Sequence, residues 1–84
     1  MGTKVIRSVM SNFERDRRQR EFLLAVQKKH MPQDADMAVA INLDNGEFLL
    51  GDRWPKLLHE FDERWPGAPH YLVRVDGRPV VRLS

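Results

Sequence analysis

An alternation of large and small side chains from residue 37 onward is the clearest pattern in the sequence. Large apolar residues occupy every second position, namely Met37, Val39, Ile41 and Leu43. A two-residue period is that of a β-strand with one face against a hydrophobic core. The following Asn45-Gly46 suits a tight turn, because both residues accept positive φ at low cost. The pattern therefore predicts a β-hairpin whose return strand covers residues 47–51.

Residues 54–65 show the longer period of an amphipathic helix. One continuous apolar stripe follows the spacing i, i+3, i+4, i+7 and i+11 and consists of Trp54, Leu57, Leu58, Phe61 and Trp65. Asp52 can cap the start of this helix, and Pro55 fits its first turn, where a missing N–H costs little. Pro66-Gly67 ends the helix, since neither residue continues one well.

A second hairpin is predicted after this helix. Residues 71–75 alternate like the first strand, and Asp76-Gly77 forms a second tight turn. The last strand is expected from Pro79 to Leu83. Because Pro79 has no N–H to donate to a ladder, this strand is placed at a sheet edge.

The N-terminal part of the chain predicts one helix, from Ser11 to Lys29. Ser11 and Glu14 have the spacing of a capping box, while Lys28 and Lys29 suit the negative end of the helix dipole. The linker that follows, residues 30–36, begins at His30 and contains Pro32, which stops the helix. We assign no element to residues 1–8.

The middle of this helix, ERDRRQRE at residues 14–21, has no apolar side chain over more than two turns. Such a segment is not expected to lie against a hydrophobic core along its length. Three opposite-charge i, i+4 pairs can stabilise it, each by ~0.2–0.5 kcal/mol, namely Glu14–Arg18, Asp16–Arg20 and Arg17–Glu21. We expect the second half of the helix to pack, and the first half to project or to meet another chain.

These elements predict an α+β fold, in which an N-terminal helix precedes a ββαββ unit with a small antiparallel sheet. The first and third strands are the most apolar, which gives the order 2-1-3-4 with one face covered by helix 54–65. The opposite face, with Ala38, Ala40 and Asn42, is expected to receive the Phe22–Val26 end of the first helix, from the same chain or from a partner. Residues 1–36 are expected to form an N-terminal helical segment and linker, and residues 37–84 the ββαββ core domain.

Composition limits the class of protein. The 84 residues suffice for one domain with one small core. The sequence has no cysteine, and no apolar run approaches the roughly 20 residues that span a bilayer, so we expect a cytoplasmic protein without membrane contact. Residues 1–36 hold eight Lys and Arg against five Asp and Glu, whereas residues 37–84 hold six against seven. The basic character thus belongs to the N-terminal segment.

Catalytic chemistry has no visible basis in the sequence. There is no nucleophile elbow, cysteine nucleophile or glycine-rich phosphate loop. His30, His59 and His70 do not share the i, i+3 or i, i+4 spacing that brings two imidazoles together, and a metal needs several convergent ligands. We therefore expect no enzyme activity, no catalytic residues, no metal and no cofactor.

Two functions remain as expectations. The first is a non-enzymatic protein-interaction module, a homo-oligomeric small regulator or antitoxin-like partner protein. Its candidate contact residues are Phe13, Phe22, Leu23, Val26 and Trp54. The alternative is a nucleic-acid-binding module that uses the arginines of the first helix, Arg15, Arg17, Arg18 and Arg20. The interleaved acids favour the first reading, because residues 14–21 have a net charge of only +1.

The stretch from Ala38 to Arg74 resembles a small uncharacterised prokaryotic domain family. Four pieces carry the resemblance, namely Val39-Ala40-Ile41, Asn45-Gly46-Glu47, Leu57-Leu58 and Tyr71-Leu72-Val73-Arg74-Val75. The resemblance covers under half of the chain and implies a hairpin, a helix and a further strand. It implies no activity, and the N-terminal helix has no counterpart in it.

Overall fold

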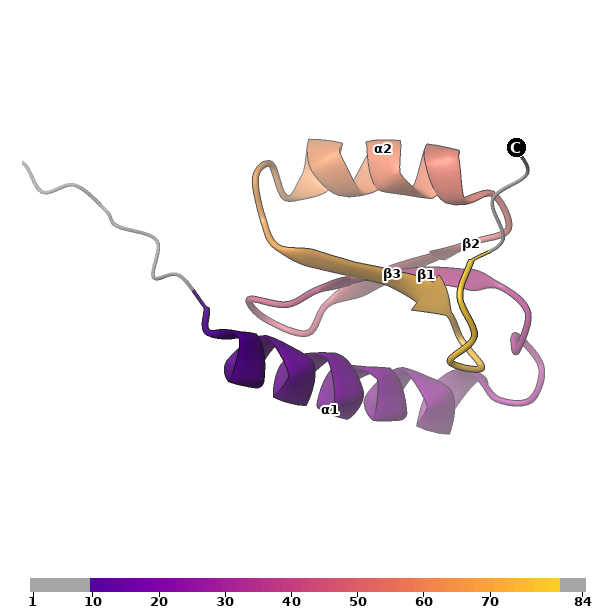
Figure 1. Cartoon of the computed structure of the whole chain (residues 1–84). Coiled ribbons are helices and arrows are strands. Elements are labelled where there is room, and N and C mark those ends of the chain that lie inside the picture. Colours follow the sequence, from indigo (N-terminus) through magenta and orange to yellow (C-terminus); the bar gives the residue numbers. More distant parts are fainter. Residues whose placement is uncertain (1–9, 81–84) are drawn as a thin grey trace, which may run out of the picture.

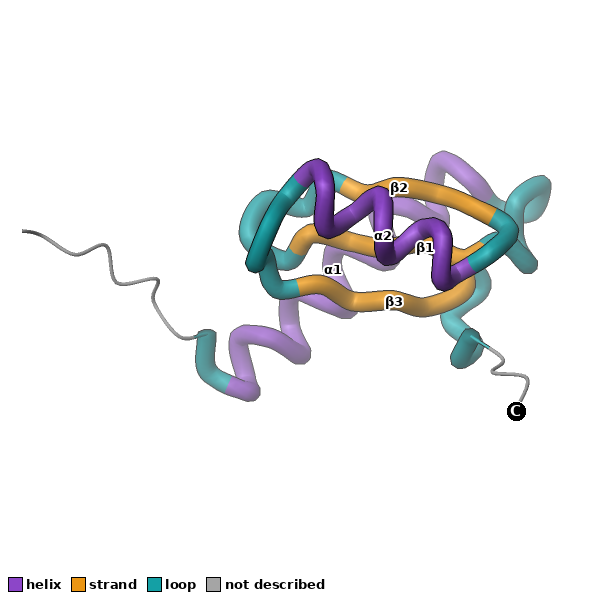
Figure 2. The backbone as a smooth tube through the Cα atoms, turned by 90° about the horizontal axis from the view of Figure 1, so that it is seen from above, coloured by secondary structure: helices purple, strands orange, loops and turns teal. Residues whose placement is uncertain are grey.

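The computed structural model describes residues 10–80 and shows an α+β fold in three layers, with a small sheet between two helices (Figure 1). The elements follow in the order α1 (Asn12–His30), β1 (Ala38–Asn42), β2 (Phe48–Gly51), α2 (Trp54–Arg64) and β3 (His70–Arg74). α1 lies on one side of the sheet and α2 on the other (Figures 1 and 2). All five residues of β1 are buried, as expected for a strand covered on both faces.

The sheet is antiparallel and has the order β2-β1-β3. This order agrees with the predicted arrangement of the first three strands, but the structure shows three strands where four were predicted. Pro79 and Val80 are not in a strand, and residues 81–83 of the predicted strand lie outside the described part, as do residues 1–8. After the turn at Gly77, Val80 leaves the sheet plane and packs on the α2 side.

The sequence predicted the second turn correctly and the first turn only in part. Gly77 has a φ of +91°, and its N–H bonds to the Arg74 carbonyl at 2.9 Å, so a tight turn is present as predicted. In the first hairpin Gly46 has the expected positive φ, at +82°, whereas Asn45 does not, so the turn is not formed by Asn-Gly in the predicted way. Instead, the side chains of Asn42 and Asn45 accept hydrogen bonds from backbone N–H groups two residues later. These Asx turns stabilise a longer connection between β1 and β2.

The assignment of helices to sheet faces reverses the prediction. α2 packs on the small face, where Leu57 and Phe61 cover Ala38 and Ala40. α1 packs on the large face, where Val26 joins a cluster with odd-numbered side chains of β1, β3 and the residues that follow them, namely Val39, Ile41, Leu43, Val73 and Val75. The physical reason is volume, because the bulky stripe of α2 fills the space that alanines leave open. α1 supplies fewer large side chains and meets the face that already has them.

α1 begins where the capping box predicts. The Ser11 hydroxyl accepts a hydrogen bond from the Glu14 N–H at 3.1 Å. The expectation that the polar half of the helix projects is wrong, because its inner side is half-buried at Arg15, Arg18 and Gln19. Guanidinium groups, rather than apolar side chains, make the contacts there.

α2 has the predicted stripe and a different start. Arg53 is its N-cap and makes no side-chain capping bond, so Asp52 does not cap the helix. Pro55 lies in the first turn as expected. Phe61 is fully buried, and its ring lies edge-on to the ring of Trp65 at 4.9 Å.

Candidate functional site

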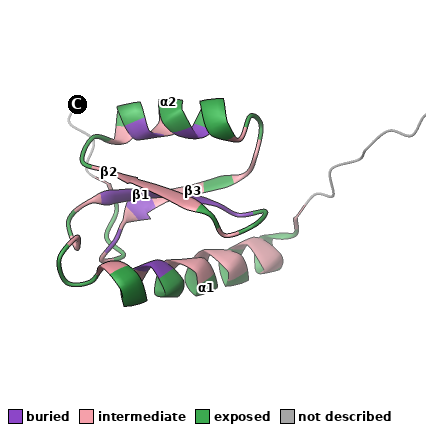
Figure 3. Ribbon diagram, turned by 180° about the vertical axis from the view of Figure 1, so that it is seen from behind, coloured by how far each residue is buried: buried purple, intermediate pink, exposed green. Residues whose placement is uncertain are grey.

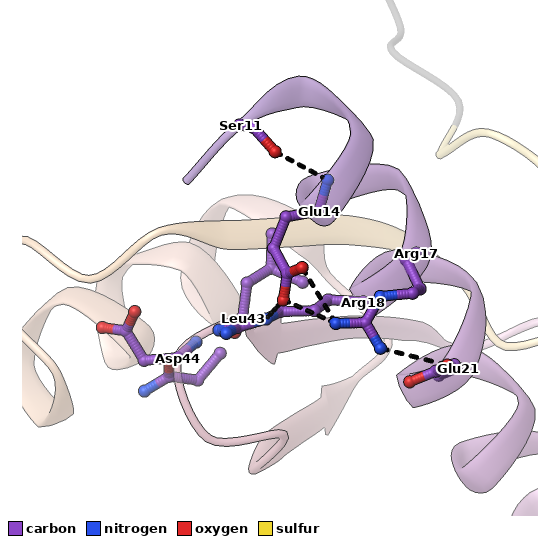
Figure 4. A network of polar contacts seen from close by, with 8 residues as sticks. Ser11, Glu14, Arg17, Arg18, Glu21, Leu43 and Asp44 are labelled. Carbon is purple, nitrogen blue, oxygen red and sulfur yellow. Dashed lines mark hydrogen bonds and ion pairs between the residues drawn. The ribbon is translucent and has the colours of Figure 1, made fainter. Parts of the chain in front are cut away.

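The arginine-rich half of α1 is held by its own carboxylates. Glu14 accepts hydrogen bonds from Arg17 at 2.8 Å and from Arg18 at 2.7 Å, and Arg17 also reaches Glu21 at 3.6 Å (Figure 4). The hydrogen bonds from Arg17, and then those from Arg18, hold the pKa of the Glu14 carboxyl below its usual value. These contacts confirm two of the three predicted i, i+4 pairs.

Two of these arginines also tie the helix to the ends of the strands. Arg18 donates to the Leu43 carbonyl at 2.8 Å, and Arg15 donates to the His70 carbonyl at 3.3 Å. The ladder satisfies neither carbonyl, because Leu43 lies opposite Pro69, which has no N–H to donate, and the backbone of His70 points outward from the edge strand β3. The guanidinium groups therefore dock the polar half of α1 on the sheet.

The four arginines predicted to bind nucleic acid do not share one environment in the structure. Arg15, Arg17 and Arg18 have intramolecular partners, and Arg20 is exposed. Asp16 and Arg20 form no ion pair within residues 10–80. A phosphate would compete with carboxylates already bonded to the same helix, which reduces what these arginines can offer a nucleic acid.

The predicted partner-binding residues lie in three different environments. Val26 is 1% exposed and belongs to the core beneath the sheet, where Phe22 and Leu23 pack against it. Phe13 is 77% exposed. Trp54 is half-buried at the start of α2, on the far side of the sheet. The five residues do not form one surface.

The outer face of α1, which points away from the sheet, carries two large apolar side chains. Leu24 is 55% exposed and lies 11 residues from Phe13. Eleven residues at 100° each amount to three turns and about 20°, so both side chains lie on one face, about 16 Å apart along the helix. Figure 3 shows the exposed side of α1 facing away from the sheet. Leu24 was not among the candidate site residues, although its spacing from Phe13 is visible in the sequence.

A groove lies on the other side of the molecule, between α2 and β3. It has a volume of ≈ 330 Å³ and a lining of apolar residues only, namely Trp54, Leu58, Leu72, Pro79 and Val80. A depression of ≈ 190 Å³ adjoins it and shares two of its lining residues, Trp54 and Val80. The lining of this depression also includes two acidic residues, Asp36 and Asp52. Sequence reasoning did not find this groove, because its lining comes from segments distant in the chain.

Arg74 also lines the depression, but its positive charge is paired with the Asp76 carboxylate. Its guanidinium bonds to the Asp76 carboxylate at 2.8 Å. The backbone N–H of Arg78 donates to the same carboxylate, and this bond, together with Arg74, lowers the pKa of the Asp76 carboxyl. Within the described residues that line this depression, the carboxylates of Asp36 and Asp52 form no ion pair with Arg74.

The histidines serve separate local contacts. His30 bonds to Asp34 at 2.9 Å and lies edge-on to the ring of Phe48. His59 reaches Glu63 at 3.3 Å on the exposed side of α2. Within residues 10–80, no three histidine or carboxylate side chains converge to hold a metal ion. Neither described helix combines the length and apolarity needed to cross a bilayer.

Comparison with known proteins gives no match that assigns a role to these surfaces. No protein-family model matches the chain, and no curated protein and no solved structure shows significant similarity to it.

Proposed function

We propose that this chain is a non-enzymatic protein-interaction module that associates with a second copy of itself through the outer face of α1. The observation that carries the proposal is the exposure of Phe13 and Leu24 on one helix face. Aromatic side chains are enriched at protein interfaces, whose rim carries polar and charged residues. The inner face of α1 is occupied by the chain's own core.

A two-fold arrangement makes this face complementary to itself. When two copies of α1 pack antiparallel about a point between residues 18 and 19, Phe13 of each helix meets Leu24 of the partner's helix. Residues whose numbers sum to 37 then lie at the same height, which places Arg17 beside Arg20 of the other copy and one residue away from its Glu21. An isologous contact of this kind closes a dimer and leaves no open end.

The size of the contact limits its strength. One helix face against another is at the low end of specific interfaces, so we expect association in the micromolar range rather than the nanomolar range. The charged residues at its centre stay near solvent and contribute mainly to orientation. The apolar pairs at the two ends supply most of the binding.

The test is the mass in solution of the wild type and of the variant Phe13→Glu/Leu24→Glu, measured by sedimentation from about 10 to 500 μM. We expect the wild type to reach dimer mass within this range. The variant should associate at least about tenfold more weakly, because two charges replace the apolar contacts. Its helix content should stay unchanged, since both side chains are exposed.

The matched control is Gln33→Glu/Asn45→Asp, which adds the same charge at exposed positions away from α1. Asn45 uses its side-chain oxygen as an acceptor for the Glu47 N–H, and an aspartate keeps that bond. The control should dimerise like the wild type. A wild type that remains monomeric throughout the range contradicts the proposal, and so does equal association of both variants.

A further inference from the structure

The groove lies between α2 and β3. Because α2 and α1 cover opposite sides of the sheet (Figure 1), the groove is separate from the face of α1 in the proposed dimer. Its walls are Trp54 and Leu58 from α2, and its floor includes Leu72 of β3. The volume of ≈ 330 Å³ exceeds those of two other depressions, of ≈ 160 and ≈ 190 Å³, whose linings include charged residues. One or two apolar side chains fit such a groove.

The adjoining sheet edge offers backbone hydrogen bonds. β3 is an outer strand, and its odd-numbered residues bond to β1, as the bond from the Leu43 N–H to the Pro69 carbonyl shows. The even-numbered residues therefore point their backbone groups outward. The His70 carbonyl already accepts from Arg15, and the N–H and carbonyl of Arg74 are both used in the turn at Gly77.

Leu72 remains between these two occupied positions. Its outward N–H and carbonyl have no hydrogen-bond partner within the described residues 10–80. The same residue lines the groove with its side chain. A segment that pairs with the backbone of Leu72 therefore directs its own side chain toward α2 and into the groove, because paired residues share a face.

The charged residues next to the groove indicate which kind of segment can bind there. Asp36 and Asp52 line the depression next to the groove, while the charge of Arg74 is held by Asp76. Among the residues that line this depression, two carboxylates outnumber one guanidinium, and this excess complements a basic side chain, although Arg53 and Lys56 share a neighbouring depression with Asp52.

We propose that the groove binds an extended segment of a partner protein, in which an apolar residue is followed two positions later by Lys or Arg. The segment adds to the edge of β3 through the backbone of Leu72. Its apolar side chain fills the groove beside Trp54, and its basic side chain lies near Asp36 and Asp52. This mode combines main-chain pairing at a sheet edge with side-chain pockets that select the sequence.

The test uses the peptide acetyl-Ser-Thr-Leu-Thr-Arg-Thr-Ser-amide and the full chain labelled with ¹⁵N. We expect saturable shifts of the Leu72 amide and of the Trp54 indole signal in nuclear magnetic resonance spectra. A peptide with Glu in place of Arg should bind more weakly, and so should a peptide with Ala in place of Leu. The Phe13→Glu/Leu24→Glu variant should bind like the wild type, which separates this outcome from that of the dimer.

The protein variants test the charge argument. Asp36→Asn/Asp52→Asn should weaken binding of the basic peptide by roughly two- to tenfold at low salt. The control Asp44→Asn/Glu63→Gln removes the same charge at exposed positions that do not line the groove, and it should bind within about twofold of the wild type.

Four results overturn the proposal. The first is that millimolar peptide leaves the Leu72 and Trp54 signals unchanged. The second is equal binding of the basic and acidic peptides, and the third is equal weakening by the two pairs of variants. The fourth is a set of contacts from residues 81–83 or from a second copy to Leu72 in the peptide-free protein, since the edge is then covered by the chain itself.

Discussion

Phe61→Ala is expected to lower the free energy of unfolding by about 3–5 kcal/mol. Phe61 is fully buried in the C-terminal half of α2, and its ring contacts those of Trp65 and His70, at centroid distances of 4.9 and 5.4 Å. Beneath it lies Ala40, which is too short to fill the space that the lost ring leaves. The site therefore collapses poorly, and a large cavity term adds to the lost burial. A typical domain has a stability of only about 5–15 kcal/mol.

Denaturant midpoints and slopes of the wild type and the variant measure this loss. The matched control is Phe13→Ala, the same chemical change at a side chain that is 77% exposed. It should change stability by less than about 0.5 kcal/mol, provided that both are measured well below the concentration at which dimers form. A loss below about 1 kcal/mol for Phe61→Ala is incompatible with its place in the core.

Ala40→Leu should destabilise the protein by about 1–3 kcal/mol through overpacking. Ala40 has no exposed surface and lies between Leu49 and Leu72 of the neighbouring strands, directly under α2. Three extra carbon atoms there must displace Phe61 or lift the helix. Substitutions that enlarge a side chain on an open surface have no such effect.

Thermal and denaturant unfolding of Ala40→Leu check this expectation. The control is Ala25→Leu, the same change at an exposed position of α1, which should stay within about 0.5 kcal/mol of the wild type because Ala and Leu have similar helix propensities. If Ala40→Leu is as stable as the wild type, α2 does not cover the small face of the sheet as the structure shows.

The sequence predicted only part of the candidate surfaces. Phe13 stands alone before a polar stretch, and this pattern indicated an exposed apolar residue at one end of α1. Phe22 and Leu23 have the same chemical character, yet they pack on the core. The sequence shows which residues are apolar, but burial depends on where each helix face points. The groove beside Trp54 needed the fold, because Leu72 and Val80 join it from other segments.

The sequence by itself determined the local elements. The Ser11 cap, the stripe of α2, the alternation in β1 and the turn at Gly77 all appear where their patterns place them. The order of the three described strands follows as well, because the two most apolar strands lie side by side. Each of these features depends on neighbours within a few residues or on the simple partition of apolar residues into the core.

Only the tertiary structure decided which helix covers which face of the sheet. Both helices have an apolar side, so periodicity alone allows either arrangement. The choice follows from volume, since the bulky side chains of α2 fill the space above Ala38 and Ala40. The polar half of α1 could dock because the carbonyls of Leu43 and His70 lie within reach of Arg18 and Arg15. Such contacts join residues 25 and 55 positions apart, a distance at which sequence spacing carries no information.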